Sequence, residues 1–259
     1  MTGLLNGAPL KMNMKLIKNI IARTLAIWSM LVFVSTMMIF LWFYLICFLL
    51  PEPNKTKWHR QVSRIWMRIF LFLSGCTFKV TGKHEFDGVE NCVVVCNHNS
   101  LIDIPVSFPF LPRANKTIAK KAFVYVPLFG WIYQFGSVLV DRKNDKSRKQ
   151  SFDEMKKVLN SGLDMLLYPE GTRNRTSAPL KSFYDGAFKL AISTNKPIIP
   201  VVLLNTKKIL PAKPVMYMTP GKITMHILPA VYPQGHTSDS LKKIVYDQMA
   251  NYYLAHTKL

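Results

Sequence analysis

Hydrophobic residues are distributed unevenly along the sequence, with one long apolar run near the N-terminus. Residues Thr24 to Leu50 include no charged side chain. A helix of this length measures roughly 40 Å at about 1.5 Å per residue, more than the roughly 30 Å of a bilayer's hydrocarbon core. A cleaved signal peptide would have a shorter apolar region and a small-residue cleavage site, and neither is evident. The run therefore predicts a retained membrane helix studded with aromatic side chains: Trp28, Phe33, Phe40, Trp42, Phe43, Tyr44 and Phe48.

A second segment, after Pro51, has the periodicity of an amphipathic helix. Apolar residues share one helical face, namely Trp58, Val62, Ile65, Trp66, Ile69 and Leu73, and basic residues share the other, namely Lys57, Arg60, Arg64 and Arg68. This pattern is typical of a basic helix lying in the membrane interface. A surface helix packed on the protein core has the same periodicity, so both interpretations stay open.

Residues 1–76 are thus predicted to form a helical membrane anchor. Basic residues flank the apolar run on both sides, so the positive-inside rule assigns no orientation. We hypothesise that the anchor embeds without carrying a large domain across the membrane. Cysteine labelling at the two ends of Thr24–Leu50 distinguishes this arrangement from a simple span.

Beyond the anchor, short apolar runs alternate with amphipathic segments. The apolar runs predict strands over Phe78–Thr81, Cys92–Cys96, Thr117–Ala119, Ser137–Val140, Leu163–Leu167, Ile198–Leu204 and Lys222–Leu228. The amphipathic segments predict helices over Ile102–Phe110, Lys146–Asn160, Ser182–Thr194 and Ser238–His256. Such alternation is typical of α/β folds. Residues 77–259 are therefore predicted to form one α/β domain with a mixed, largely parallel sheet flanked by helices.

Charge and cysteine usage narrow the class of protein. The formal net charge is +20, yet the mean hydropathy is positive at +0.14. This combination favours a protein on an anionic membrane, handling acidic substrates, over a nucleic-acid binder. The cysteines Cys47, Cys76, Cys92 and Cys96 form neither a disulfide framework nor a Cys-x-x-Cys zinc pattern, and are predicted to be buried in a reducing compartment.

A histidine and an aspartate follow the second predicted strand. His98 and Asp103 can meet if His98 lies in the turn after the strand and Asp103 in the first turn of the next helix. The carboxylate would then bind one imidazole nitrogen and make the other a better base. A satisfied histidine at a strand end and a helix-dipole aspartate would give the same spacing, so the pair alone does not decide between the two interpretations.

A second polar cluster, Glu170-Gly171-Thr172-Arg173, follows the predicted strand Leu163–Leu167. Arginine suits phosphate because its planar fork donates two parallel hydrogen bonds, and Gly171 lets backbone amides approach a ligand. Lys120 and Arg142, each near a strand end, would extend a phosphate site. Ligands of open α/β sheets bind outside the carboxyl ends of strands, so the two clusters are predicted to share one site.

Several other chemistries lack their sequence patterns. There is no Gly-x-Ser-x-Gly elbow, no phosphate-binding P-loop, no Gly-x-Gly-x-x-Gly fingerprint and no histidine with metal-ligand spacing. By elimination, the base would act on a hydroxyl of the substrate itself, and no metal is expected.

The ordered set of motifs resembles the glycerolipid acyltransferase family, most closely the 1-acylglycerol-3-phosphate (lysophosphatidic acid) acyltransferases. The set comprises His98 with Asp103, Lys120 with Pro127–Trp131, Asp141-Arg142, Tyr168–Arg173 and Lys196–Val201. The resemblance implies His98 as general base, Asp103 as its orienting partner, and Glu170, Gly171, Thr172 and Arg173 as the acceptor site, with Arg173 on the phosphate. Lys120 and Arg142 match positions linked to the phosphate. Two departures are Tyr168, where phenylalanine is commoner, and Asp185, where a basic residue commonly precedes the glycine.

The expected activity is transfer of a fatty acyl chain from acyl-CoA or acyl carrier protein to lysophosphatidic acid, without a further cofactor. Three alternatives stay open: an acyltransferase for another lysolipid or an N-acyl amino acid lipid, a thioesterase, and a non-catalytic basic binder. The expected partners are the bilayer, the lysophospholipid and the thioester donor, with no nucleic acid. The active site is expected on the cytoplasmic face, and the compact chain favours a bacterial inner membrane over the endoplasmic reticulum.

Overall fold

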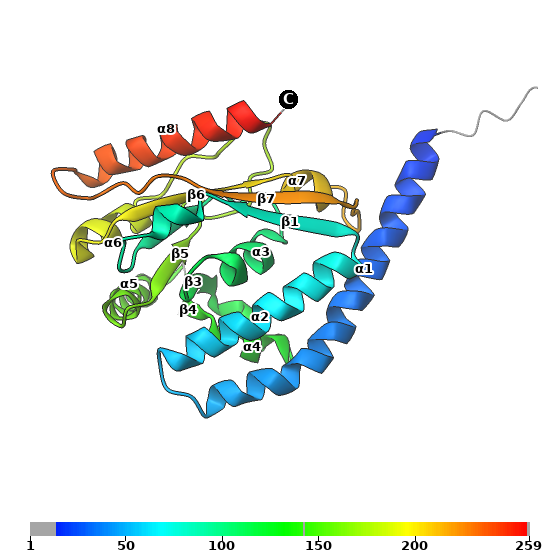
Figure 1. Ribbon diagram of the computed structural model, residues 1–259, viewed down its shortest axis with the longest axis horizontal. Helices are drawn as coiled ribbons and strands as arrows, with labels where there is room; N and C mark the ends of the chain where they lie inside the picture. The colour runs from blue at the N-terminus through cyan, green and yellow to red at the C-terminus, as the bar shows by residue number, and fades with distance from the viewer. Residues whose placement is uncertain (1–13, 142, 258–259) are drawn as a thin grey trace, which may run out of the picture.

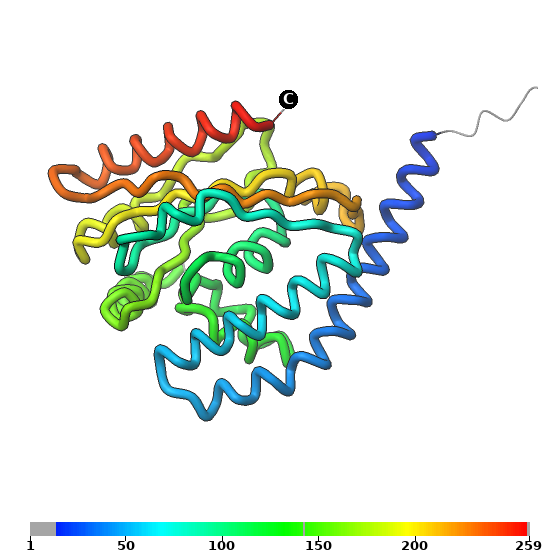
Figure 2. The backbone as a smooth tube through the Cα atoms, in the orientation of Figure 1, coloured from blue at the N-terminus to red at the C-terminus, as the bar shows by residue number. Residues whose placement is uncertain are grey.

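A central sheet with helices on both faces forms the body of the computed structural model, which describes residues 14–141 and 143–257 (Figures 1 and 2). The strands are β1 (Cys76–Thr81), β2 (Val93–Cys96), β3 (Asn115–Lys120), β4 (Ser137–Val140), β5 (Asp164–Leu167), β6 (Ile198–Leu204) and β7 (Gly221–Ile227). The helices are α1 (Met14–Leu45), α2 (Asn54–Leu73), α3 (Asp103–Phe110), α4 (Phe129–Phe135), α5 (Asp145–Asn160), α6 (Gly186–Thr194), α7 (Thr206–Ile209) and α8 (Ser238–His256). All seven predicted strands are present, with ends within two residues of the prediction.

The sheet is mixed and mostly parallel, as predicted. Its strand order is β1-β7-β6-β2-β5-β3-β4. The five strands from β6 to β4 are parallel to one another, whereas β7 runs antiparallel to β6 and β1 runs parallel to β7. The carboxyl ends of five strands therefore meet at one edge of the sheet, where ligands of open α/β sheets bind.

Alternating residues of the buried strands supply two separate cores. Val94 and Cys96 face the core formed with α1 to α4, while Val93 and Val95 face the core formed with α5, α6 and α8. This division follows from the period-2 geometry of a strand. Strands that are apolar on both faces need helices on both sides, which explains the three layers.

The first two helices form an antiparallel hairpin along one side of the body (Figure 1). Trp66 of α2 donates a hydrogen bond to Thr36 of α1 over 2.8 Å, and Tyr44 and Ser63 share one of 2.6 Å. The N-terminal part of α1 projects beyond the rest of the chain (Figures 1 and 2). Over Met14–Phe48 this segment is long and apolar enough to cross a membrane. Many large side chains of this segment are exposed, including Trp42, and Leu49 just after its end is exposed as well. The rest of the protein therefore leaves the apolar surface of the segment uncovered.

The outer helix α2 packs on the α/β core more closely than its charge pattern predicts. Val62 and Trp66 are buried, but Ile65, Ile69 and Leu73 of the same predicted face are exposed. The buried face of α2 also includes Met67, Phe70 and Leu71, so it is rotated from the predicted face. The predicted face therefore lies partly in the core and partly at the surface.

Two basic residues of α2 hold the end of α3. Arg64 Nε and Nη2 donate to the carbonyls of Pro109 and Leu111 over 2.9 and 3.0 Å, and Arg60 also donates to Leu111. The carbonyls at a helix C-terminus lack partners within the helix, and cations there also favour its dipole. These arginines therefore fix the helix that begins with Asp103.

The described cysteines are buried and free, as predicted for Cys47, Cys76, Cys92 and Cys96. The short helix α4, which the sequence pattern did not predict, lies beside α2 through a hydrogen bond of 2.9 Å between His59 Nε2 and the Ile132 carbonyl. A helix of only seven residues, most of them apolar or aromatic, gives no amphipathic signal, so the sequence pattern did not predict it.

Glu52 connects the hairpin to the sheet, and this contact predicts a pH-dependent stability. Its carboxylate accepts from Lys116 over 2.6 Å and from Thr56 over 2.7 Å. Burial alone would raise the pKa of Glu52, but the hydrogen bonds and the charge of Lys116 outweigh it and lower the pKa below the ordinary 4.5. A lowered pKa in the folded state stabilises the fold above the unfolded pKa, and this stability is lost as the pH falls through the folded value.

We therefore expect Glu52→Gln to lower the unfolding temperature at pH 7, and the difference from the parent to shrink below pH 4.5. Thermal unfolding in detergent across this pH range measures both. A difference that stays constant with pH would contradict the assignment.

Candidate active site

The two polar clusters predicted from the sequence meet because their strands are neighbours in the sheet. β2 pairs with β5 in parallel, with Val95 opposite Leu167. His98 and Glu170 each follow that pair by three residues, so they leave the sheet at the same level. The backbone N–H of His98 donates to Glu170 Oε1 over 2.7 Å. The two clusters that were predicted to share a site are therefore in direct contact at this edge of the sheet.

His98 and Asp103 also meet, in the geometry that the spacing predicts. His98 Nδ1 lies 2.9 Å from Asp103 Oδ2, across the turn between β2 and the first residue of α3. The same oxygen accepts the backbone N–H groups of Asn99 and Ser100, each over 2.6 Å. Asp103 is fully buried, whereas the His98 side chain is 16% exposed.

This geometry assigns the imidazole tautomer. An ionised carboxylate only accepts hydrogen bonds, so Nδ1 carries a proton and donates a hydrogen bond to Asp103. The other nitrogen, Nε2, then keeps its lone pair and can accept a proton. The negative charge of Asp103 sits at the N-terminus of α3 and takes three donors, which is a favourable place for a carboxylate.

Tyr168 supports the His98 ring from one side. The two ring centroids are 4.7 Å apart, and the Tyr168 hydroxyl shares a hydrogen bond of 2.5 Å with Ser107 of α3. Burial raises the pKa of Tyr168 well above its ordinary value, so the hydroxyl stays neutral. Phenylalanine is commoner than tyrosine at position 168 in the family that the sequence resembles. The hydrogen bond to Ser107 explains how the tyrosine hydroxyl is accommodated here.

The carboxylate of Glu170 binds the protein's own backbone. Oε1 accepts from His98 N and Oε2 accepts from Lys181 N over 2.9 Å. The side chain is almost fully buried, and burial raises its pKa more than these two hydrogen bonds lower it. Glu170 therefore positions the His98 turn and the loop after β5. Thr172 and Arg173, which follow it in the sequence, reach the surface.

The loop after β5 closes over the His98 turn. Asn174 N donates to the His98 carbonyl over 2.6 Å, and Lys181 Nζ donates to Thr172 Oγ1 over 2.7 Å. Gly171 begins the loop with φ of 69°, a backbone conformation that favours glycine. The Arg173 side chain is half-buried and makes no hydrogen bond or ion pair with any other described residue, so its guanidinium is available to a ligand.

The remaining predicted residues are placed less closely. Lys120 ends β3 at the same edge of the sheet and is exposed. β5 separates β3 from β2, so Lys120 stands one strand further from His98 than Glu170 does. Arg142 lies outside the described residues. Within residues 14–141 and 143–257, no three His, Cys, Asp or Glu side chains converge as metal ligands.

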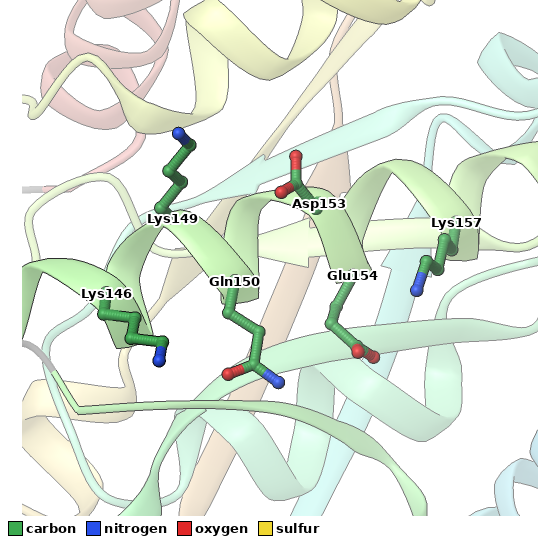
Figure 3. Close-up of a pocket in the computed structure, with 6 residues that line it drawn as sticks. All are labelled: Lys146, Lys149, Gln150, Asp153, Glu154 and Lys157. Carbon is green, nitrogen blue, oxygen red and sulfur yellow. The ribbon is translucent and has the colours of Figure 1, made fainter.

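A surface hollow on α5 is not part of this site. Figure 3 shows its lining side chains spread along one helix, and they are Lys146, Lys149, Gln150, Asp153, Glu154 and Lys157. Because these all come from successive turns of a single helix, the hollow lies between solvated side chains and has no opposing wall.

Three contributions to the site had no signal in the sequence: the ring contact of Tyr168 and the backbone donors of Asn174 and Lys181. Backbone donors carry no side-chain signature. The Tyr168 contact depends on which strands are neighbours, which the sequence does not state.

The chain matches known proteins over this region. Residues 77–204 match the sequence model of the family described as Acyltransferase. The 1-acyl-sn-glycerol-3-phosphate acyltransferase of Cocos nucifera is 31% identical over 168 residues, which cover 64% of this chain and 54% of that protein. The beta form of the enzyme from Homo sapiens is 29% identical over 209 residues, which cover 78% of this chain and 72% of that protein. This chain thus spans about half the length of the coconut relative.

A solved structure shares the fold. The 1-acyl-sn-glycerophosphate (LPA) acyltransferase PlsC of Thermotoga maritima superposes with a TM-score of 0.78 at 23% identity. The match covers 95% of this chain and 100% of that one, so it extends beyond residues 77–204.

Proposed function

We propose that the chain transfers a fatty acyl group from a thioester to the free hydroxyl of 1-acylglycerol-3-phosphate, because residues 77–204 match the acyltransferase family model and relatives that carry this activity in their names match the same region. The observation that carries the proposal is the His98–Asp103 pair. A buried carboxylate holds Nδ1 over 2.9 Å and leaves Nε2 as a base at the ligand-binding edge of the sheet.

The reaction needs one base and no covalent enzyme intermediate. His98 Nε2 takes the proton of the acceptor hydroxyl as its oxygen attacks the thioester carbonyl. The new C–O bond forms, the C–S bond breaks, and the leaving thiolate takes up the proton from the imidazolium. Asp103 stabilises the imidazolium between these two steps. Glu170 and Tyr168 hold the His98 turn and ring throughout.

The acceptor phosphate is proposed to lie on the surface of the loop after β5. No described residue binds the Arg173 guanidinium there, and Thr172 presents its hydroxyl beside Lys181. Lys120 at the end of β3, together with Arg142, would add positive charge. A phosphate carries the charge and acceptor oxygens that such a cluster favours.

The membrane is proposed to supply the acceptor and to receive the product. α1 is long and apolar enough to cross a bilayer, and its large side chains are exposed. The net charge of +20 favours an anionic membrane surface. We place the active site on the cytoplasmic face, in a bacterial inner membrane, with either acyl-CoA or acyl carrier protein as donor.

A transfer assay with purified protein tests the proposal. Protein in detergent is given radiolabelled acyl-CoA, or the acyl carrier protein thioester, with lysophosphatidic acid or other lysolipids. We expect labelled phosphatidic acid from lysophosphatidic acid. Transfer only to other lysolipids would overturn the acceptor assignment, and release of free fatty acid without an acceptor would identify a thioesterase.

Arg173 provides a test of the phosphate site. We expect Arg173→Ala to lower kcat/KM for lysophosphatidic acid roughly ten- to hundredfold, mainly through KM, because a charge-assisted hydrogen bond contributes about 1.5–3 kcal/mol. Steady-state kinetics with varied acceptor measure the effect. Arg175→Ala is the matched control, since Arg175 is exposed two residues away. Equal effects of the two substitutions would argue for a general loss of positive charge.

A further inference from the structure

The segment between β3 and α4 exposes apolar side chains that nothing in the described chain covers. A 3₁₀ helix, η3 (Lys121–Tyr125), includes no buried residue, although it holds Ala122, Phe123, Val124 and Tyr125. Phe123 is 46% exposed, Tyr125 77% and the following Val126 43%. Placing such side chains in water is unfavourable, so an apolar cluster of this kind marks an interaction surface.

This segment is held in place by specific packing. A Cβ at Gly130 would lie 2.0 Å from the Val124 carbonyl oxygen, so only glycine lets α4 approach η3 this closely. Gly130 N donates to Val126 O over 2.8 Å, and the Phe123 and Tyr133 rings are 5.5 Å apart. The outward direction of Tyr125 and Val126 is therefore built into the fold.

The exposed surface continues onto the tip of the α1–α2 hairpin. Trp131 of α4 is 43% exposed and contacts Phe48, which is 58% exposed, with ring centroids 6.2 Å apart. Leu49 beside it is exposed as well. We define the η3–α4 surface as Phe123, Tyr125, Val126 and Trp131. It adjoins the end of the segment that is long and apolar enough to cross a membrane.

The charges around this surface indicate which partner it fits. Exposed Lys120 and Lys121 lie directly beside it, no acidic residue occurs in the sequence between Asp103 and Asp141, and Glu52 near the hairpin tip is paired with Lys116. Exposed aromatic rings with adjacent lysines match the headgroup region of an anionic bilayer, where rings lie at the level of the ester groups and lysines reach phosphates.

We propose that the η3–α4 surface is a second membrane contact, which inserts into the headgroup region of an anionic bilayer beside the α1–α2 hairpin. η3 directly follows the carboxyl end of β3, at the same edge of the sheet as His98. Two contacts, one at the hairpin and one at this edge, fix how the body is oriented and turn the candidate active site toward the bilayer. The inference rests on the membrane location in the proposed function.

A fluorescent label measures the contact without using activity. The full chain with Tyr125→Cys is labelled with an environment-sensitive dye and reconstituted into vesicles containing phosphatidylglycerol. The described natural cysteines are buried, so the added thiol is the accessible one. Tyr232→Cys is the matched control, because Tyr232 is a tyrosine of 54% exposure outside the surface.

We expect lipid-borne quenchers to quench the dye at position 125 several-fold more strongly than at position 232, and aqueous iodide to show the reverse. Equal iodide quenching at both positions would overturn the inference, because the surface would then face water. Protection at position 125 that disappears as protein is diluted into excess lipid would also overturn it, since a second copy of the chain would be the partner.

A kinetic comparison separates this inference from the proposed activity. Tyr125→Glu is expected to lower the transfer rate about tenfold with acceptor in vesicles, because the charged side chain removes apolar burial in the bilayer, and to leave the rate with a dispersed short-chain acceptor unchanged. Equal losses with both acceptors would overturn the membrane contact. If no acceptor is acylated at all, the proposed function fails while the quenching result still decides the contact.

Discussion

Replacing His98 by alanine is expected to lower acyl transfer at least roughly a thousandfold. The geometry leaves Nε2 of His98 as the base at the site, with Asp103 holding the other nitrogen over 2.9 Å. General base catalysis contributes about 10²–10⁴ to a rate, and removal of the ring also takes away the group that returns the proton to the thiolate. Single-turnover transfer to lysophosphatidic acid measures the chemical step directly.

The fold is expected to survive this substitution. The His98 side chain contributes one hydrogen bond and a ring contact, while the backbone bonds to Glu170 and Asn174 remain. His84→Ala is the matched control, since that histidine is exposed on the surface, and it is expected to transfer at the parent rate. Substantial turnover by a folded His98→Ala protein would remove His98 from the chemistry.

The sequence predicts where the helices and strands begin and end more completely than it predicts which strands are adjacent in the sheet. The strand Ile198–Leu204 and the helix Ser238–His256 are predicted to the residue, because apolar runs and helical periodicity are local signals. The order of strands is a property of the folded chain. That β5 adjoins β2, with Val95 opposite Leu167, is what brings Glu170 to His98, and no local pattern states it.

The same limit explains the two interpretations of α2. Helical spacing predicts which residues share a face, but it does not say whether a membrane or a core covers that face. Trp66 and Ile65 are adjacent in sequence, and only Trp66 is buried, against Thr36 and Phe33 of α1. Arg60 and Arg64, on the basic face for which both interpretations stayed open, donate to carbonyls at the end of α3.

Glu170 shows how a motif and its geometry complement each other. The resemblance implies that Glu170 to Arg173 hold the acceptor together. In the structure, Glu170 is almost fully buried and both its oxygens bind backbone N–H groups, whereas Arg173 has no partner among the described residues. Physical placement thus divides one four-residue motif into a positioning residue and a residue available to a ligand.

Substitutions at Asp103 are expected to separate the placement of His98 from the charge that stabilises it. All three donors to Asp103 meet at Oδ2, and no described residue binds Oδ1. In Asp103→Asn, the amide oxygen can therefore take the Oδ2 position and keep the three hydrogen bonds, while the NH₂ group takes the position of Oδ1. The opposite orientation would point the NH₂ group at the Asn99 and Ser100 donors.

Asp103→Asn is thus expected to keep the imidazole in place and remove only the charge that stabilises the imidazolium, with a loss of about 1.5–3 kcal/mol or roughly ten- to hundredfold in rate. Asp103→Ala leaves three buried donors without a partner, each costing about 1–3 kcal/mol. It is therefore expected to lower both the rate, by roughly a thousandfold or more, and the unfolding temperature. Single-turnover rates and thermal unfolding of the two variants measure the separation. If Asn and Ala reduce the rate equally while only Ala loses stability, the charge of Asp103 alone supports catalysis, and the placement argument fails.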